Sequence, residues 1–110
     1  MKKLLLTLLA CCAIVPSVQA DDLDAAREKV KNIFISDEEP TTKDAIWSTP
    51  SVFKVGVKDN GTNRNGYAEY VCLTLGEHGF NGKGIIVKVI DIDKLVKTGK
   101  WVDLGMAQCP

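Results

Sequence analysis

The stretch Ile85-Ile86-Val87-Lys88-Val89-Ile90 is the most strongly apolar segment that follows the first twenty residues of the chain. Every residue in it except Lys88 is β-branched, and β-branched side chains favour extended backbone. A short apolar run between turn signals is typical of a strand that is buried inside a sheet. We therefore expect residues 85–90 to form the central strand of a β-sheet.

The segments around this strand predict three further strands. Residues 53–57 and 67–75 alternate apolar with polar or small side chains, which is the two-residue period of a half-buried strand. Residues 101–106 predict a short last strand. Clusters rich in glycine and asparagine at residues 59–66 and 76–84 separate the strands and predict turns.

Three segments predict helical structure. An amphipathic helix is expected over residues 23–34, where aspartates precede the first turn and apolar side chains recur at spacings of three and four residues. Its apolar positions are Leu23, Ala26, Val30, Ile33 and Phe34. A single helical turn is expected over residues 41–47. Residues 91–99 predict a capped helical turn that begins at Asp91 and ends at Gly99.

Together these elements predict an α+β domain over residues 21–110, with one N-terminal helix packed on a four-stranded, mainly antiparallel sheet. If the strands followed one another as a meander, the first and third connections would lie at the same end of the sheet. Residues 63–65 would then lie near residues 91–100, and His78 would lie at the opposite end.

Residues 1–20 have the three parts of a secretory signal peptide. Two lysines follow Met1, residues 4–15 are apolar, and residues 18–20 form the exit of the leader. The apolar run is too short for a transmembrane helix. The lysines and the compact apolar core are typical of bacterial leaders. We therefore expect cleavage after Ala20 and a periplasmic or secreted domain.

The four cysteines divide between the leader and the domain. Cys11 and Cys12 lie in the leader, and an alternative interpretation places a lipid on Cys11. Leu9 is larger than the residue that a lipoprotein processing box prefers at its position, which favours cleavage after the leader instead. Cys72 and Cys109 remain, and two cysteines in an exported domain of this size predict one disulfide.

The charge balance bears on the class of partner. The chain has 14 basic and 14 acidic residues, and loss of the two leader lysines would leave a slightly acidic domain. The sequence contains no basic stripe that could neutralise phosphates. We therefore expect no nucleic-acid partner.

The chain carries no recognisable catalytic or cofactor motif. Asp91 and Asp93 could act as paired carboxylates, but their place at a strand end favours helix capping. A zinc site on Cys72 and Cys109 would need two more ligands, and His78 is the single histidine. We expect no cofactor and no metal. A small hydrolase or metal-dependent enzyme that uses His78 with Asp91 or Asp93 stays as an alternative.

Four residues are the candidates for a partner-binding surface. Asn63, Arg64 and Asn65 lie in a long polar turn, and loops on a rigid frame often carry recognition. Trp47 is added because tryptophan is a frequent interface anchor as well as a core residue. These features favour a small non-enzymatic binding protein that acts on a protein partner, such as an inhibitor or an envelope accessory factor. A carrier of a small apolar ligand between helix and sheet is the other alternative.

Overall fold

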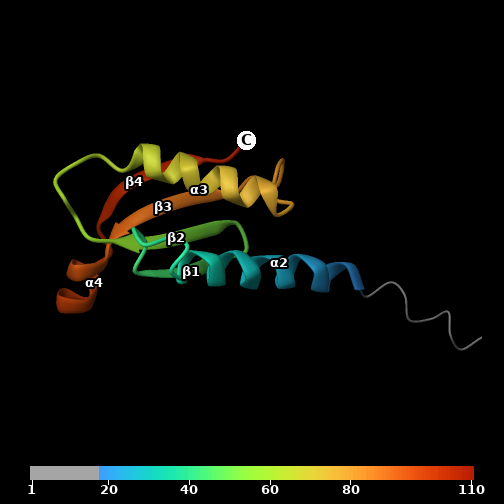
Figure 1. The fold of residues 1–110 in the computed structure, drawn as a ribbon, viewed down its shortest axis with the longest axis horizontal. Helices are drawn as coiled ribbons and strands as arrows, with labels where there is room; N and C mark the ends of the chain where they lie inside the picture. Colours follow the sequence, from blue (N-terminus) through green and yellow to red (C-terminus); the bar gives the residue numbers. More distant parts are fainter. Residues whose placement is uncertain (1–17) are drawn as a thin grey trace, which may run out of the picture.

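In the computed structural model, which describes residues 18–110, four strands form one mixed sheet in the order β1-β2-β3-β4 (Figure 1). The elements are α2 (Val18–Phe34), β1 (Asp44–Thr49), β2 (Val52–Val57), α3 (Asn65–Glu77), β3 (Ile86–Asp91), α4 (Ile92–Thr98) and β4 (Asp103–Gln108). The outer pairs β1–β2 and β3–β4 are antiparallel, whereas the central pair β2–β3 is parallel. The α+β class and the four-stranded, mainly antiparallel sheet are thus confirmed. The predicted leader, with Cys11, lies almost entirely outside the described residues.

The segment predicted as a strand over residues 67–75 is a helix, so the predicted meander is wrong. Parallel neighbours need a crossover connection, and α3 provides it between β2 and β3. Its buried residues Ala68, Val71, Cys72 and Leu75 recur at spacings of three and four. Leu73, which the two-residue alternation grouped with Val71 and Leu75, is 67% exposed.

Residues 41–47, predicted as a helical turn, instead lead into the edge strand β1. Ala45 is buried and Trp47 half-buried, whereas Ile46 between them points to the other face and is exposed. All three residues are apolar, so the sequence does not show the alternation of buried and exposed side chains that the structure has. A tight turn after Thr49 then returns the chain into β2, which lies antiparallel to β1.

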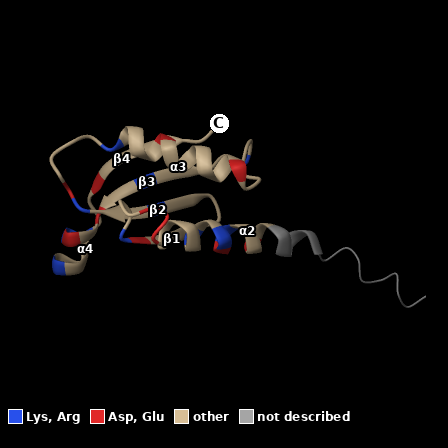
Figure 2. Cartoon of the chain, in the orientation of Figure 1, with Lys and Arg blue, Asp and Glu red and all other residues tan. Residues whose placement is uncertain are grey.

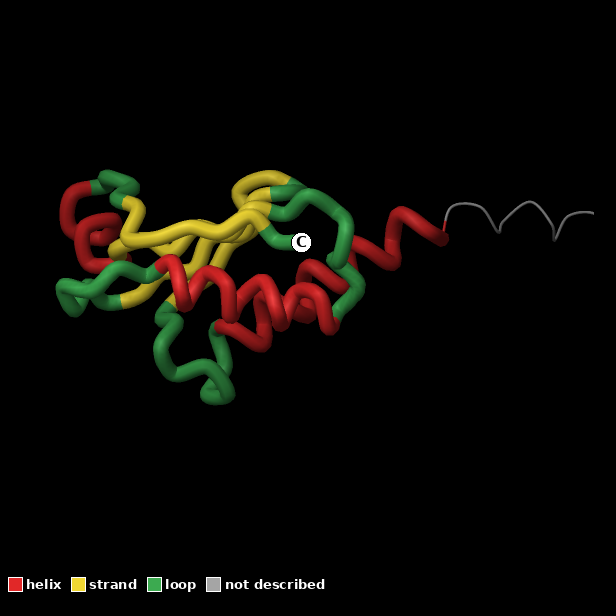
Figure 3. Tube along the Cα trace, turned by 90° about the horizontal axis from the view of Figure 1, so that it is seen from above, coloured by secondary structure: helices red, strands yellow, loops and turns green. Residues whose placement is uncertain are grey.

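Helices α2 and α3 both lie on one side of the sheet, which we call the covered face (Figure 3). α2 contacts β1, and α3 contacts β3 and β4. The strand residues of this face are Ala45, Trp47, Phe53, Val55, Val57, Val87, Val89, Gly105 and Ala107. They pack against Val30 and Phe34 of α2 and the buried side of α3 to form the core.

The predicted disulfide is confirmed. The Sγ atoms of Cys72 and Cys109 are 2.09 Å apart, and their Cα atoms 5.2 Å. The bond joins the buried side of α3 to the residue that follows β4, and the backbone N–H of Cys109 donates to the carbonyl of Ile85. The disulfide therefore holds the C-terminal tail against the core.

The predicted capped turn over residues 91–99 is also confirmed, as α4. Asp91 is the N-cap residue, and its Oδ1 accepts a hydrogen bond from the backbone N–H of Lys94 at 3.0 Å. Gly99 ends the helix in the left-handed conformation, with φ of 76°. No helix within residues 18–110 is long and apolar enough to cross a membrane.

Candidate functional site

The residues predicted from the polar turn lie at the start of α3, against the outer edge of β4. The backbone N–H of Arg64 donates to the carbonyl of Leu104 at 3.0 Å, and Asn65 Oδ1 accepts from the N–H of Met106 at 2.9 Å. Asn63 Oδ1 accepts from the N–H of Asn65 at 2.7 Å. Arg64 and Asn65 therefore protect an edge strand, because they occupy backbone groups that another strand could pair with.

Trp47 lies on β1, at the opposite edge of the sheet, on the covered face. Its ring centroid is 4.7 Å from that of Phe53 and 5.4 Å from that of Phe80, and its Nε1–H donates to the carbonyl of Arg27 at 3.0 Å. The structure thus gives Trp47 a packing role between α2 and the sheet. It does not bring Trp47 together with Arg64 and its neighbours.

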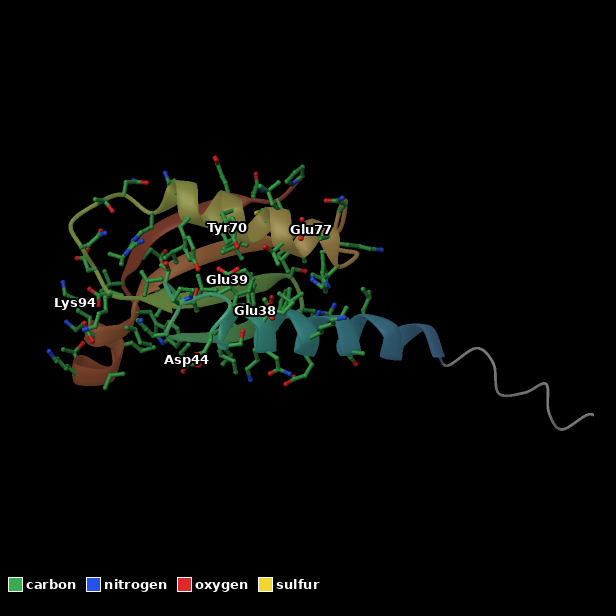
Figure 4. All side chains as sticks on the ribbon, in the orientation of Figure 1. Glu38, Glu39, Asp44, Tyr70, Glu77 and Lys94 are labelled. Carbon is green, nitrogen blue, oxygen red and sulfur yellow. A yellow bond between two sulfur atoms is a disulfide. The ribbon has the colours of Figure 1, made fainter. Side chains whose placement is uncertain are left out.

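The residues of the alternative enzyme site are also separated. His78 follows the C-terminal end of α3, whereas Asp91 and Asp93 lie where β3 passes into α4. Figure 4 shows these two ends through their labelled neighbours, Glu77 and Lys94. The sheet length lies between His78 and both aspartates, so they do not form one site.

The segments that follow β2 and β3 lie at the same end of the sheet, because these two strands are parallel. Lys58 Nζ, which follows β2, is 3.6 Å from Asp93 Oδ2 of α4. The meander was predicted to place residues 63–65 near residues 91–100. In the structure Arg64 and Asn65 instead form hydrogen bonds with Leu104 and Met106 of β4.

No group of three or more His, Cys, Asp and Glu side chains that could hold a metal ion occurs in the part of the chain that the structure describes. The two cysteines of that part are joined to each other. Space between the helices and the sheet is filled by the core, where Phe34, Phe53 and Phe80 are at most 1% exposed.

The other side of the sheet, which we call the open face, has a different character. Two rows of residues cross it at successive paired positions of the four strands. The first row is Ile46, Lys54, Lys88 and Met106, which we call the lysine row. The second row is Asp44, Gly56, Ile90 and Asp103. Two lysines thus lie side by side at the centre of this face, with apolar side chains at both edges.

A hollow of about 330 Å³ lies beside the lysine row, between β1, β2 and α4. Its apolar lining consists of Ala45, Ile46, Gly56, Ile90, Ile92, Leu95 and Trp101, and Lys31, Asp44 and Lys54 complete it. A Cβ on Gly56 would lie 2.9 Å from Cδ1 of Ile92, so this glycine lets α4 approach the sheet. Trp101 is 50% exposed and Ile46 is 47% exposed, which leaves the hollow shallow.

The two central lysines are held differently. Lys54 Nζ lies over the Trp101 ring, 4.3 Å from its centroid, in a cation–π contact. Lys88 Nζ is 3.7 Å from Asp103 Oδ2. Within residues 18–110, Lys54 forms no ion pair. Lys31 and Asp44 line the hollow together with Lys54, so two lysines and one aspartate leave this part of the open face with a net positive charge beside apolar surface.

Acidic and basic residues are interspersed along the chain (Figure 2), and the helical side of the molecule carries an acidic loop in addition to Asp44 and Asp103 of the open face. The loop after α2 contains Asp37, Glu38 and Glu39, and Tyr70 of α3 donates a hydrogen bond to Glu39 Oε2 at 2.5 Å (Figure 4). This hydrogen bond raises the pKa of the Tyr70 phenol. Burial raises the pKa of the neighbouring Tyr67 phenol, whose Oη lies 2.6 Å from Thr42 Oγ1. The acidic loop is thus tied down on α3.

Comparison with known proteins found no significant relative of this chain. No family model matches the chain, and neither the curated proteins nor the solved structures contain a significant match. The candidate site therefore depends on the arrangement of its residues alone.

Proposed function

We propose that this chain is a small exported, non-enzymatic binding protein that recognises a protein partner with the open face of its sheet. One observation carries the proposal: Trp101, Ile46 and Met106, each 45–50% exposed, surround the lysine row on a face that α4 covers at one end. Exposed aromatic and large aliphatic side chains grouped on one face are typical of protein-binding surfaces.

A protein partner suits this face better than a small apolar ligand. Small-molecule pockets enclose most of their ligand and have volumes of about 300–1,000 Å³. The hollow, at about 330 Å³, is at the low end of that range, and its wall residue Trp101 is half exposed. Such a hollow is suited to one large side chain of a partner, whose remaining surface would lie across the lysine row.

Export is the second part of the proposal. It is supported by the signal-peptide pattern of residues 1–20 and by the Cys72–Cys109 disulfide, a bond that persists in oxidising compartments. Intact-mass analysis of protein recovered from the producing cells should find a chain that begins at Asp21 and has no free thiol. A chain that keeps its first twenty residues would contradict export, whereas a lipid on Cys11 would contradict cleavage after Ala20.

Site-specific photo-crosslinking in the producing cells tests the surface. A photoreactive side chain is placed at Ile46 or Met106 of the open face and, as the control, at Leu73 on α3, which is more exposed than either. We expect one discrete protein adduct from both open-face positions and none from Leu73. Adducts from Leu73 alone, or the same adducts from all three positions, would contradict the proposed surface.

A further inference from the structure

The lysine row specifies the chemistry of the partner. Lys54 and Lys88 are paired residues on adjacent strands, so their side chains project side by side from the open face. Like charges at paired positions disfavour each other unless a neighbouring group compensates them. Asp103 compensates Lys88, and the Trp101 ring lies under Lys54. A ring stabilises a cation without neutralising it, so Lys54 can still pair with an incoming anion.

We infer that the open face binds an acidic segment of a protein partner, in which one large apolar side chain occupies the hollow and adjacent carboxylates contact Lys54 and Lys88. This inference rests on the proposed function and adds the chemistry of the partner. The carboxylates and the apolar anchor would need to be close in sequence, because Lys54 itself lines the hollow.

Charge also argues against the most symmetric arrangement of a second copy of this chain on this face. If a two-fold axis passed through the centre of the lysine row, the row of each copy would lie against that of the other. Four lysine side chains would then gather at the centre of that contact, and like-charge contacts of this kind select against such an arrangement. The acidic loop of residues 37–39 belongs to the opposite, helical side, where it is tied to α3 through Tyr70.

Three blocked peptides test the inference against the isotope-labelled, purified protein. The first has one tryptophan flanked on each side by two aspartates. The second replaces the aspartates by lysines, and the third replaces the tryptophan by alanine. Binding is followed through the NMR signals of the Ile46, Gly56 and Ile90 amides and of the Trp101 indole N–H.

We expect the acidic tryptophan peptide to shift these signals and to bind at least about fivefold more tightly than either control, with an affinity that falls as salt is added. Lys54→Gln should weaken that binding, whereas Lys83→Gln, in an exposed loop at the other end of the sheet, should not. Lys54→Gln removes the same charge as its control and introduces no repulsion, which keeps the risk of misfolding low. Unfolding curves verify that both variants fold.

Three results would overturn the inference. If the lysine-flanked peptide shifts the same signals and binds equally or more tightly, the partner segment is not acidic, although the open face is still a binding surface. Shifts that follow protein concentration without peptide would assign the face to a second copy. If the acidic peptide shifts none of these signals, the inferred chemistry is wrong. The photo-crosslinking result then decides separately whether the open face binds a partner.

Discussion

The two faces of the sheet are built by the same four strands, yet they differ in composition and burial. On the covered face, Val55 and Val89 are completely buried under the helices. One residue away along each strand, Lys54 and Lys88 reach the open face. Side chains alternate along a strand, so each face can be composed independently of the other. The covered face forms the core of the fold, and the open face is the surface that we propose for recognition.

The largest loss of stability is expected when the disulfide on the covered side is removed. Replacing Cys72 and Cys109 by serine should lower the free energy of unfolding by about 4 kcal/mol, because the bond closes a loop of about 38 residues in the unfolded chain. Urea unfolding with and without the substitutions measures this loss. Wherever the variant stays folded, its open face should still bind.

A loss below about 1 kcal/mol would mean that the disulfide adds little to the packing of α3 on β4. Loss of open-face binding by a variant that unfolding curves show to be folded would mean that the two faces are coupled. Either result would contradict the division described above.

Gly105 tests how tightly the covered face is packed. A Cβ at this position would lie 2.3 Å from the carbonyl carbon of Arg64 and 2.5 Å from the backbone nitrogen of Asn65. The start of α3 would have to move away from β4, so Gly105→Ala should lower the free energy of unfolding by about 3 kcal/mol. Thermal and urea unfolding measure the change.

Gly66→Ala is the matched control, since a Cβ there meets nothing within 4 Å. Alanine is favoured over glycine in a helix, so this variant should be neutral or up to about 1 kcal/mol more stable. Equal destabilisation by both substitutions would show that the close approach of α3 to Gly105 is not what stabilises this corner.

Much of the covered face could be predicted from the sequence, because its signals are local. The strands at residues 53–57 and 85–90, the helix that ends at Phe34, the Asp91 cap and the disulfide follow from periodicity, capping chemistry and cysteine count. Residues 67–75 failed because both periods are present there. The alternation of apolar and polar side chains favoured a strand. The residues that are buried in the structure, Ala68, Val71, Cys72 and Leu75, instead follow the spacing of a helix.

The open face could not be predicted, because it depends on pairing between distant strands. The lysine row exists only when Lys54 and Lys88 lie on parallel neighbours in a defined register. Its edge residue Ile46 belongs to β1, a strand that the sequence concealed among consecutive apolar side chains. Trp101 belongs to the segment predicted as the last strand, but its contact with Lys54 follows from the position of the chain after α4.

The helical layer offers a smaller, pH-dependent test. Tyr67→Phe removes the hydrogen bond to Thr42, which is 5% exposed and would lose its side-chain partner. We expect a loss of about 1.5 kcal/mol at neutral pH. Because burial raises the pKa of the folded Tyr67 phenol above its ordinary 10.0, the stability it contributes is complete below the unfolded pKa and is lost as pH rises through the folded pKa.

The difference in unfolding free energy between the native chain and Tyr67→Phe should therefore shrink above about pH 10. Measuring both proteins at each pH cancels the titration of lysines, which they share. A difference that stays constant or grows with pH would show that the folded protein does not favour the neutral form of the Tyr67 phenol.

The smallest change in stability is expected on the open face, where a substitution should affect binding much more than folding. Trp101→Ala removes a half-exposed ring and the cation–π contact with Lys54, so the free energy of unfolding should fall by only about 0.5 kcal/mol. The same substitution should abolish crosslinking from Met106, because it removes the wall of the hollow. Leu73→Ala, at an exposed apolar residue of α3, should change neither quantity. If Trp101→Ala instead cost as much as Gly105→Ala while crosslinking persisted, Trp101 would be a structural residue and the open face would have no privileged role in recognition.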